Sequence, residues 1–216
     1  MRIGNQMYNE LLLQIELTTK CTIECPGCPR TYKKKENDTT WDYGHIDKQI
    51  VFDQIESNDY HKLIFAGAYG DPIYHPDFIE IMDRATKFNK RIKVETNGSF
   101  KKRKWWEQLS ELSWTDNISF NFSIDGLEDT NHIYRKNSRW KDIMQGVETL
   151  VNAKQRPKLI WQMLIFPYNE HQVEEAQTLS KQLGFDEFHS SKSLRNYAKS
   201  WFESEQERKS IVWNYS

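Results

Sequence analysis

The feature that most constrains the fold is a regular alternation of short apolar segments with segments of helical periodicity. Segments that suit β-strands lie at 11–17, 63–66, 92–95, 118–124, 159–166 and 185–189. Apolar stripes at helical spacing separate them, over 46–55, 78–88, 105–112, 143–150 and 173–183. Strands joined by helical crossovers pair in parallel, with right-handed connections. The sequence therefore predicts an α/β fold, a partial (βα)6 TIM-like barrel with a parallel sheet.

Nothing in the sequence divides the chain. It has no internal repeat and no linker rich in Pro, Gly or Ser, so we expect one domain over 1–216, with a core at about 10–190. A short C-terminal tail or helix is expected over 191–216, and Asn169 is expected to cap the helix that carries Val173.

Charge and hydropathy indicate which partners to expect. The chain has 30 basic and 31 acidic residues, which does not indicate nucleic-acid binding. The sequence contains neither a secretory signal nor a membrane-spanning stretch. Its odd number of cysteines, clustered in one place, favours a reducing compartment, and we expect a cytoplasmic protein.

All three cysteines lie within eight residues, with the spacing C-x3-C-x2-C: Cys21, Cys25 and Cys28. Three interpretations are open. They could be reduced structural thiols, although so crowded a loop is not typical of core packing. Cys25 and Cys28 could form a dithiol redox pair, which leaves Cys21 unexplained. The third interpretation is an iron–sulfur cluster held by three thiolates, with one iron left open for another ligand.

The unusual polar and glycine-rich segments all follow predicted strands. The cysteine loop follows the first strand, 67–72 the second, 96–98 the third and 123–126 the fourth. Because the carboxyl ends of parallel strands share one edge, these segments should converge on one site.

In this order, the motifs resemble those of the radical S-adenosylmethionine (SAM) superfamily. The spacing C-x3-C-x2-C, whose first cysteine ends the run IELTTKC, resembles the cysteine signature of the superfamily. Residues 67–72 resemble its glycine–glycine–glutamate–proline segment, with Asp71 in place of Glu. Three later motifs agree as well: Glu95-Thr96-Asn97-Gly98, Ser123-Ile124-Asp125-Gly126 and Asn131-His132-x2-Arg135. The core is similar to that of the molybdenum-cofactor and SPASM-type enzymes. With no cysteine after Cys28, we expect no C-terminal auxiliary-cluster extension.

The resemblance implies two cofactors, a 4Fe–4S cluster and SAM. Cys21, Cys25 and Cys28 would hold the cluster, whose open iron would take the amino and carboxylate groups of SAM. One electron from a low-potential donor of the flavodoxin or ferredoxin type would cleave SAM to a deoxyadenosyl radical, which abstracts hydrogen from a substrate.

The same resemblance implies a set of SAM contacts. Glycine-lined backbone would receive the amino group, and hydroxyl, amide and carboxylate side chains would bind the carboxylate or ribose. An arginine would pair with the SAM carboxylate. The implied set is Gly67, Gly70, Asp71, Pro72, Thr96, Asn97, Ser123, Asp125 and Arg135. Ordinary turns or a surface ion pair remain alternatives for several of them.

The substrate is not named by these motifs. The similarity to longer peptide-modifying enzymes favours a peptide or protein. The alternatives are a small enzyme that makes a deazapurine precursor, one that activates a glycyl-radical enzyme, and a non-catalytic iron–sulfur electron-transfer module.

Overall fold

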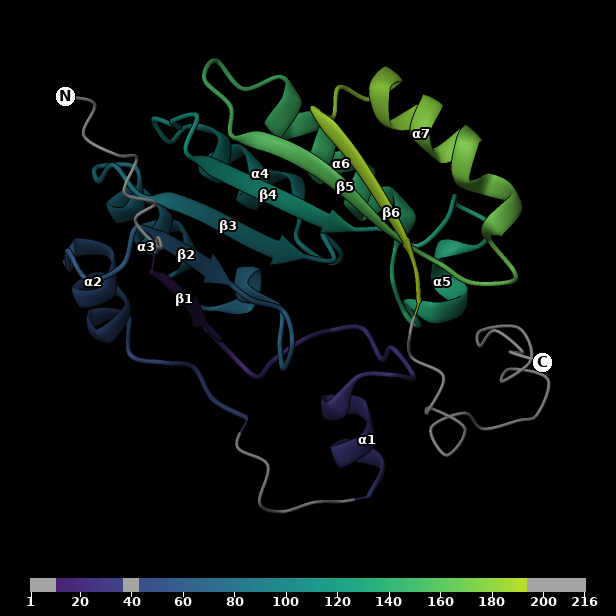
Figure 1. Cartoon of the computed structure of the whole chain (residues 1–216), viewed down its shortest axis with the longest axis horizontal. Helices are drawn as coiled ribbons and strands as arrows, with labels where there is room; N and C mark the ends of the chain where they lie inside the picture. Colours follow the sequence, from purple (N-terminus) through teal and green to yellow (C-terminus); the bar gives the residue numbers. More distant parts are fainter. Residues whose placement is uncertain (1–10, 37–42, 194–216) are drawn as a thin grey trace, which may run out of the picture.

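A computed structural model describes residues 11–36 and 43–193, and they form a single curved six-stranded sheet with helices against it (Figure 1). All strand pairs are parallel, and the strand order follows the sequence. The strands are β1 (Leu12–Ile15), β2 (Lys62–Phe65), β3 (Arg91–Thr96), β4 (Ile118–Ser123), β5 (Lys158–Ile165) and β6 (Glu187–Lys192).

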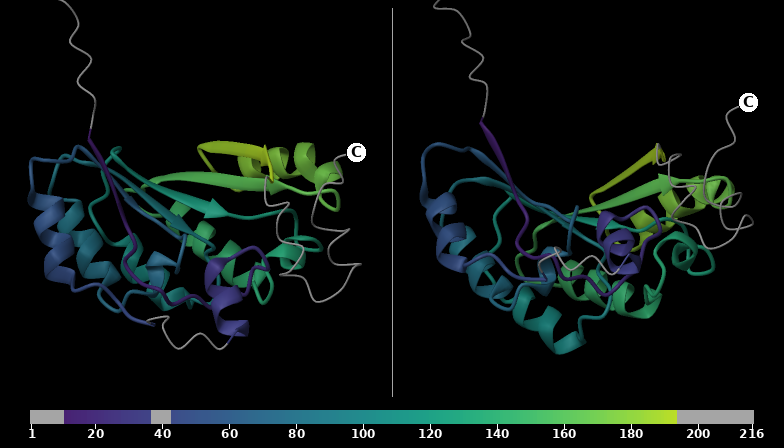
Figure 2. Two further views of the ribbon diagram at one scale, coloured as in Figure 1. Left: turned by 60° about the horizontal axis from the view of Figure 1, so that its bottom comes forward. Right: turned by 90° about the horizontal axis from the view of Figure 1, so that it is seen from below.

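This topology confirms the predicted partial barrel. Within the described residues β1 pairs only with β2 and β6 only with β5, so the sheet curves without closing. Figure 2 shows the curvature and the open side.

The helices begin and end close to the predicted stripes. Two short helices were not predicted, α1 directly after the cysteines and α5 in the segment 131–134. The helices are α1 (Pro29–Lys35), α2 (Lys48–Glu56), α3 (Phe78–Ala85), α4 (Arg103–Ser110), α5 (Asn131–Tyr134), α6 (Trp140–Val151) and α7 (Val173–Gln182), with short 3-10 helices η1 (Pro72–Tyr74) and η2 (Glu170–Gln172). Among the described residues, none of these helices has the length and apolarity needed to cross a lipid bilayer.

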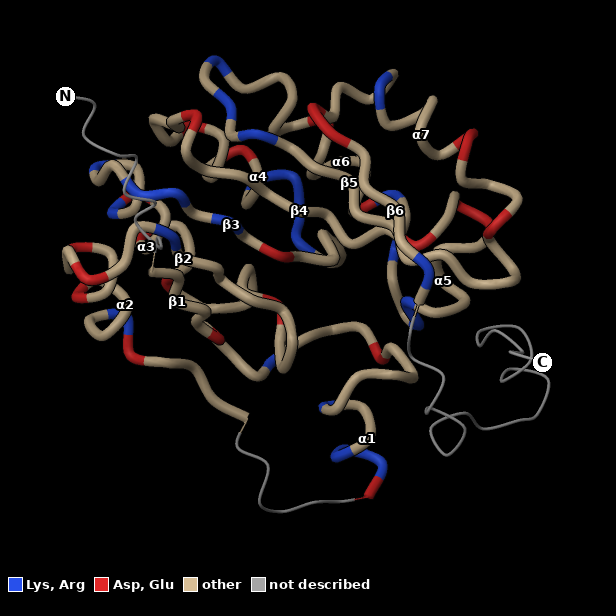
Figure 3. The backbone as a smooth tube through the Cα atoms, in the orientation of Figure 1, with Lys and Arg blue, Asp and Glu red and all other residues tan. Residues whose placement is uncertain are grey.

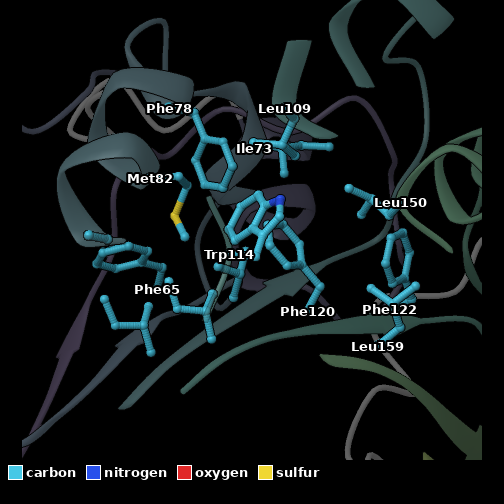
Figure 4. Close-up of a cluster of buried hydrophobic side chains, with 14 of the residues drawn as sticks. Phe65, Ile73, Phe78, Met82, Leu109, Trp114, Phe120, Phe122, Leu150 and Leu159 are labelled. Atoms are coloured by element: carbon cyan, nitrogen blue, oxygen red, sulfur yellow. The ribbon is translucent and has the colours of Figure 1, made fainter. Parts of the chain in front are cut away.

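The hydrophobic core lies between the sheet and the helices on its convex face (Figures 2 and 4). Alternate residues of each central strand point into it, as Phe120 and Phe122 of β4 do, and both are fully buried. Trp106 of α4 is also fully buried and packs against Phe122, and its ring fills the space beside Gly146 of α6. This core holds the strands in place, and their carboxyl ends carry the site.

The opposite, concave face of the sheet is mixed, with polar side chains beside apolar ones such as Ile160. Its strands alternate between core residues and polar residues such as Lys93, Glu95, Asn121 and Gln162. Two of these pairs interact: Lys93 Nζ lies 2.7 Å from Glu95 Oε1, and Asn121 donates to Gln162 at 3.4 Å. The inner surface of this incomplete barrel therefore presents hydrogen-bonding and charged groups.

Two details differ from the sequence predictions. Asn169 does not cap α7, because its side chain accepts from Phe166 N and donates to the carbonyls of Asp125 and Leu164. The sixth strand begins at Glu187 and extends to Lys192, later than predicted, because Phe185 N donates back to Ser180 O at 3.0 Å in the turn that Gly184, at φ +86°, forms at the helix end. The expected tail helix falls almost entirely outside the described residues.

Candidate functional site

Ten of the twelve predicted site residues line one pocket at the carboxyl edge of the sheet. They are Cys21, Cys25, Cys28, Gly67, Gly70, Asp71, Thr96, Asn97, Ser123 and Arg135. Pro72 and Asp125 are buried beside it and do not line it. The convergence expected from strand order is thus observed, with β1 to β4 each contributing the segment that follows it.

The cysteine loop forms a tight turn that leads into α1. Cys28 N donates to Cys25 O at 3.1 Å, and Cys28 is the residue before the first turn of α1, where Pro29 suits the helix start. Arg30 is buried and donates to the carbonyl of Ile23, which closes the loop on itself. These bonds fix the backbone between the second and third cysteines.

Two contacts from distant segments hold the same loop. Glu24 N donates to Lys136 O at 2.9 Å, directly after the predicted Arg135. The Tyr74 hydroxyl lies 2.9 Å from Thr22 Oγ1 and donates to the carbonyl of Ser99. Sequence reasoning missed Tyr74, since an aromatic residue in a short helical turn carries no signal for such a role.

Gly70 is required by packing between two backbone segments. A Cβ atom at this position would lie 2.0 Å from the carbonyl oxygen of Thr18. Asp71 N donates to Lys20 O at 2.9 Å, so 70–71 lies directly against the chain that enters the cysteine loop. The resemblance implies that Gly70 belongs to backbone that receives the SAM amino group; in the structure, the close approach at Gly70 is to the protein's own loop.

Asp71 organises the end of β3. Its Oδ2 accepts from Thr96 Oγ1 at 3.0 Å, from Asn97 N at 2.8 Å and from the Asn97 side-chain amide. Its Oδ1 accepts from Ile73 N at 3.2 Å. Burial raises the pKa of Asp71 to about 6, although these hydrogen bonds favour its charged form. With four donors on its two oxygens, Asp71 positions Thr96 and Asn97 rather than facing the pocket as an open acceptor.

Two nitrogen donors lie close to cysteine sulfurs. Asn97 Nδ2 lies 3.5 Å from Cys21 Sγ, and Arg135 Nη1 lies 4.0 Å from Cys25 Sγ. Such donors favour a thiolate over a thiol. Burial, and secondarily the carboxylate of Asp71, raise the pKa of Cys21 to about 12 in the metal-free chain, so a metal must displace its proton on binding.

Arg135 is held by Asp125 in a buried ion pair. Arg135 Nε donates to Asp125 Oδ2 at 2.6 Å, and the Asp125 side chain is fully buried. The second carboxylate oxygen accepts from Leu164 N at 2.8 Å, at the end of β5. Asp125 therefore influences the pocket only through Arg135. The sequence analysis had treated the two residues as independent contacts to SAM.

Glu16, which sequence reasoning missed, holds the glycine-rich loop. Its carboxylate accepts from the backbone nitrogens of Ala68 and Tyr69, at 3.3 and 3.1 Å. The available signal was a charged residue between the apolar Ile15 and Leu17.

The donor set fits an iron–sulfur cluster better than a single ion. Within 11–36 and 43–193, no three Cys, His, Asp or Glu side chains are arranged to hold one metal ion. In a cluster each thiolate binds a different iron, so the three sulfurs need not meet at one point. Three thiols on one pocket wall, with amide and guanidinium donors beside them, are the groups that such a cluster requires.

A second cavity, of about 460 Å³, adjoins this pocket on the concave face. The two share five residues: Gly67, Ala68, Glu95, Ser123 and Arg135. Its other walls come from Gln162 and Leu164 of β5 and from the end of β6. A molecule in this cavity would therefore lie next to whatever the cysteine pocket holds.

Comparison with known proteins gives both sequence relatives and structural neighbours. The chain is 26% identical over 176 residues to the mycofactocin maturase MftC of Mycobacterium tuberculosis, which covers 81% of this chain and 42% of that protein. It is also 26% identical over 115 residues to the tungsten-containing aldehyde ferredoxin oxidoreductase cofactor-modifying protein of Pyrococcus furiosus, covering 52% and 30%. The chain thus spans less than half the length of these relatives.

Solved structures share the fold. SuiB of Streptococcus suis, bound to S-adenosylmethionine, superposes with a TM-score of 0.67 at 15% identity, covering 95% of this chain and 44% of SuiB. The structure of anSMEcpe with bound S-adenosylmethionine gives a TM-score of 0.61 at 18% identity, covering 85% and 51%.

The family model described as the radical SAM superfamily matches residues 15–179, which include the cysteine loop and the ends of the first five strands. This family uses a 4Fe–4S cluster and SAM, which confirms the two cofactors predicted from the sequence and the assignment to an enzyme family. With the fold, the cysteine spacing and the family match in agreement, the chain belongs to the radical SAM superfamily.

Proposed function

We propose that this chain cleaves SAM reductively at a cluster held by Cys21, Cys25 and Cys28, in order to abstract hydrogen from a peptide substrate. One observation carries the proposal: the three thiols, the Asn97 amide and the Arg135 guanidinium line a single pocket at the carboxyl edge of the sheet. When bound, the cluster and SAM together supply a carbon-centred radical strong enough to attack a C–H bond.

The chain's own residues hold and orient the cofactors in this proposal. The three thiolates would bind three irons of a cluster and leave the fourth for SAM. Asn97, fixed by Asp71, and Arg135, fixed by Asp125, face the sulfurs and the remaining space. Arg135 is suited to pair with a carboxylate because it keeps its positive charge. Burial alone would lower its pKa, but the negative charges of Asp125 and Cys25 outweigh burial and raise it. A preorganised polar wall of this kind limits side reactions of a reactive intermediate.

The peptide substrate is supported by the neighbours and by the adjoining cavity. SuiB has been solved bound to its precursor peptide SuiA, and anSMEcpe with a bound Cp18Cys peptide. In this chain the cavity of about 460 Å³ has mostly polar walls and shares five residues with the cysteine pocket. A peptide backbone there would meet hydrogen-bonding side chains such as Ser123 and Gln162.

A low-potential donor of the flavodoxin or ferredoxin type is proposed as the source of the electron. A reducing, cytoplasmic compartment is proposed on the same chemistry, since partly exposed thiols such as Cys21 and Cys28 would be lost to oxidation elsewhere.

The test is anaerobic reconstitution with iron and sulfide, followed by SAM and dithionite. We expect about four irons per chain and release of 5′-deoxyadenosine, measured by chromatography. Cys25→Ala should lose both the cluster and the cleavage. The control is Lys141→Ala, at an exposed position on α6, which should retain both.

Two outcomes would contradict the proposal. An intact cluster without any deoxyadenosine would indicate an electron-transfer module instead. A Cys25→Ala protein that keeps four irons would show that the ligand assignment is wrong.

A further inference from the structure

A third cavity, of about 320 Å³, lies on the concave face at the opposite end of the strands from the cysteines. It is formed at the beginnings of β2 to β5 and by the facing part of β6, and none of its lining residues belongs to the cysteine pocket. Its charged and titratable lining is predominantly basic: Lys62, Arg91, Lys93, Lys158 and His189 surround a single carboxylate, Asp116. Figure 3 shows the basic segments at the beginnings of β3 and β5.

The register places like charges directly opposite each other. Lys62 of β2 pairs with Arg91 of β3, and Lys93 follows two residues later on the same face of β3. Like charges opposite each other in a sheet are destabilising. Three of these basic groups have acidic neighbours: Lys93 pairs with Glu95, and both Lys158 and His189 contact Glu187. In the described part of the chain, no carboxylate lies within 4 Å of Lys62, and the cavity lining itself carries four Lys or Arg side chains and one carboxylate.

The basic cavity and the cysteine pocket are connected along the inner surface of the sheet. Lys93 lines the basic cavity and Glu95 lines the cavity beside the cysteines, and the two side chains are 2.7 Å apart. Asn121 and Gln162 link the same two cavities at 3.4 Å. Four residues of β3 separate Arg91 from Glu95, which corresponds to about 13 Å along a strand. An extended peptide would cover this distance with about four residues.

We propose that the concave face binds an extended peptide whose distal part carries carboxylates, held by Lys62, Arg91 and their basic neighbours about four residues from the reacting position. This inference rests on the proposed peptide-modifying function and names the class of peptide. Charge complementarity selects an acidic segment, and the polar inner wall supplies hydrogen bonds to its backbone.

Binding can be measured on the reconstituted protein with SAM, by fluorescence anisotropy of two labelled peptides. The probes are ten-residue peptides of alternating Gly and Glu, or of alternating Gly and Gln, carrying a neutral dye. We expect the Glu peptide to bind about tenfold more tightly than the Gln peptide at low salt, and the difference to shrink as salt is added. The double variant K62Q/R91Q should bind the two peptides equally.

The matched control K141Q/K181Q removes two positive charges from exposed positions on α6 and α7 and should keep the wild-type preference. If the control also lost the preference for the Glu peptide, the preference would arise from the net charge of the protein, and the proposal would be overturned. Equal binding of both peptides by the wild type would also overturn it, as would displacement of the Glu peptide by low concentrations of inorganic phosphate, which would identify a small-anion site. Should K62Q/R91Q not fold, as judged by its iron content, the single variant K62Q is expected to reduce the preference severalfold.

The release of deoxyadenosine tests the proposed function separately from peptide binding. If the wild type produces no deoxyadenosine, that function fails whatever the peptides do. If it does produce deoxyadenosine and shows no preference for the Glu peptide, only the inference about the acidic peptide fails.

Discussion

Arg135 and Asp125 form a buried ion pair, with 2.6 Å between Nε and Oδ2, and Arg135 Nη1 points toward Cys25 at 4.0 Å. Removing the carboxylate would leave a buried guanidinium without its partner. We expect Asp125→Ala to lower the free energy of unfolding by about 3–5 kcal/mol, because an unpaired buried charge costs that much. Urea denaturation of the metal-free protein measures it.

The control is Lys87→Ala, which removes an exposed i,i+4 pair with Asp83 on the convex side. Exposed pairs contribute less than about 1 kcal/mol, so this variant should unfold near the wild-type midpoint. Equal losses in the two variants would mean that the pair of Arg135 and Asp125 has no special structural role.

Asn97 links Asp71 to the sulfur of Cys21, and this contact should affect the cluster directly. Asn97→Ala removes the donor 3.5 Å from Cys21 Sγ, so we expect a more negative reduction potential and about tenfold faster loss of iron to a chelator. A potential titration followed by electron paramagnetic resonance gives the first quantity, and iron release the second. Asn152→Ala, at the exposed end of α6, is the control, and an unchanged potential in Asn97→Ala would contradict the assignment.

The sequence was sufficient for the architecture because the alternation of strands and helices leaves few topologies. Helical periodicity located α2 to α4, α6 and α7, whereas α1 and α5 were missed because helices of seven and four residues are too short to show a periodic stripe. Polar segments after the strands located the pocket, since parallel strands bring their carboxyl ends to one edge.

Partners within the site could not be predicted in the same way. Asp71 and Thr96 are 25 residues apart, and only the folded sheet brings them to 3.0 Å. The resemblance implies that both residues contact the cofactor, whereas in the structure Asp71 positions Thr96. Likewise Asn169 fits a helix cap by its sequence position, and its amide instead ties the end of β5 to Asp125.

Gly70 and Gly67 offer a matched pair for the glycine-rich loop. At Gly70 a Cβ would lie 2.0 Å from the Thr18 carbonyl, whereas at Gly67 the nearest atom, the Glu95 carbonyl oxygen, is 3.2 Å away. We expect Gly70→Ala to cost about 3 kcal/mol or more and Gly67→Ala clearly less, because backbone atoms cannot move aside as a side chain can. Thermal unfolding of the metal-free proteins compares them, and equal shifts in Tm would contradict the close packing at Gly70.

Asp71 should make the stability of the metal-free protein depend on pH in a defined direction. Burial raises its pKa from an ordinary value of 3.8 to about 6, so the folded state binds a proton more tightly than the unfolded state does. The stabilisation from that proton is complete below pH 3.8 and is lost as the pH rises through 6. Relative to Asp71→Asn, which does not titrate, the wild type should lose up to about 3 kcal/mol of unfolding free energy between pH 4 and pH 7. Urea denaturation of both proteins across this range measures the difference, and comparing them cancels the other titrating groups. A difference that is constant with pH, or that grows in favour of the wild type toward pH 7, would show that Asp71 is already fully ionised in the folded protein at pH 4 and that its four hydrogen bonds outweigh its burial.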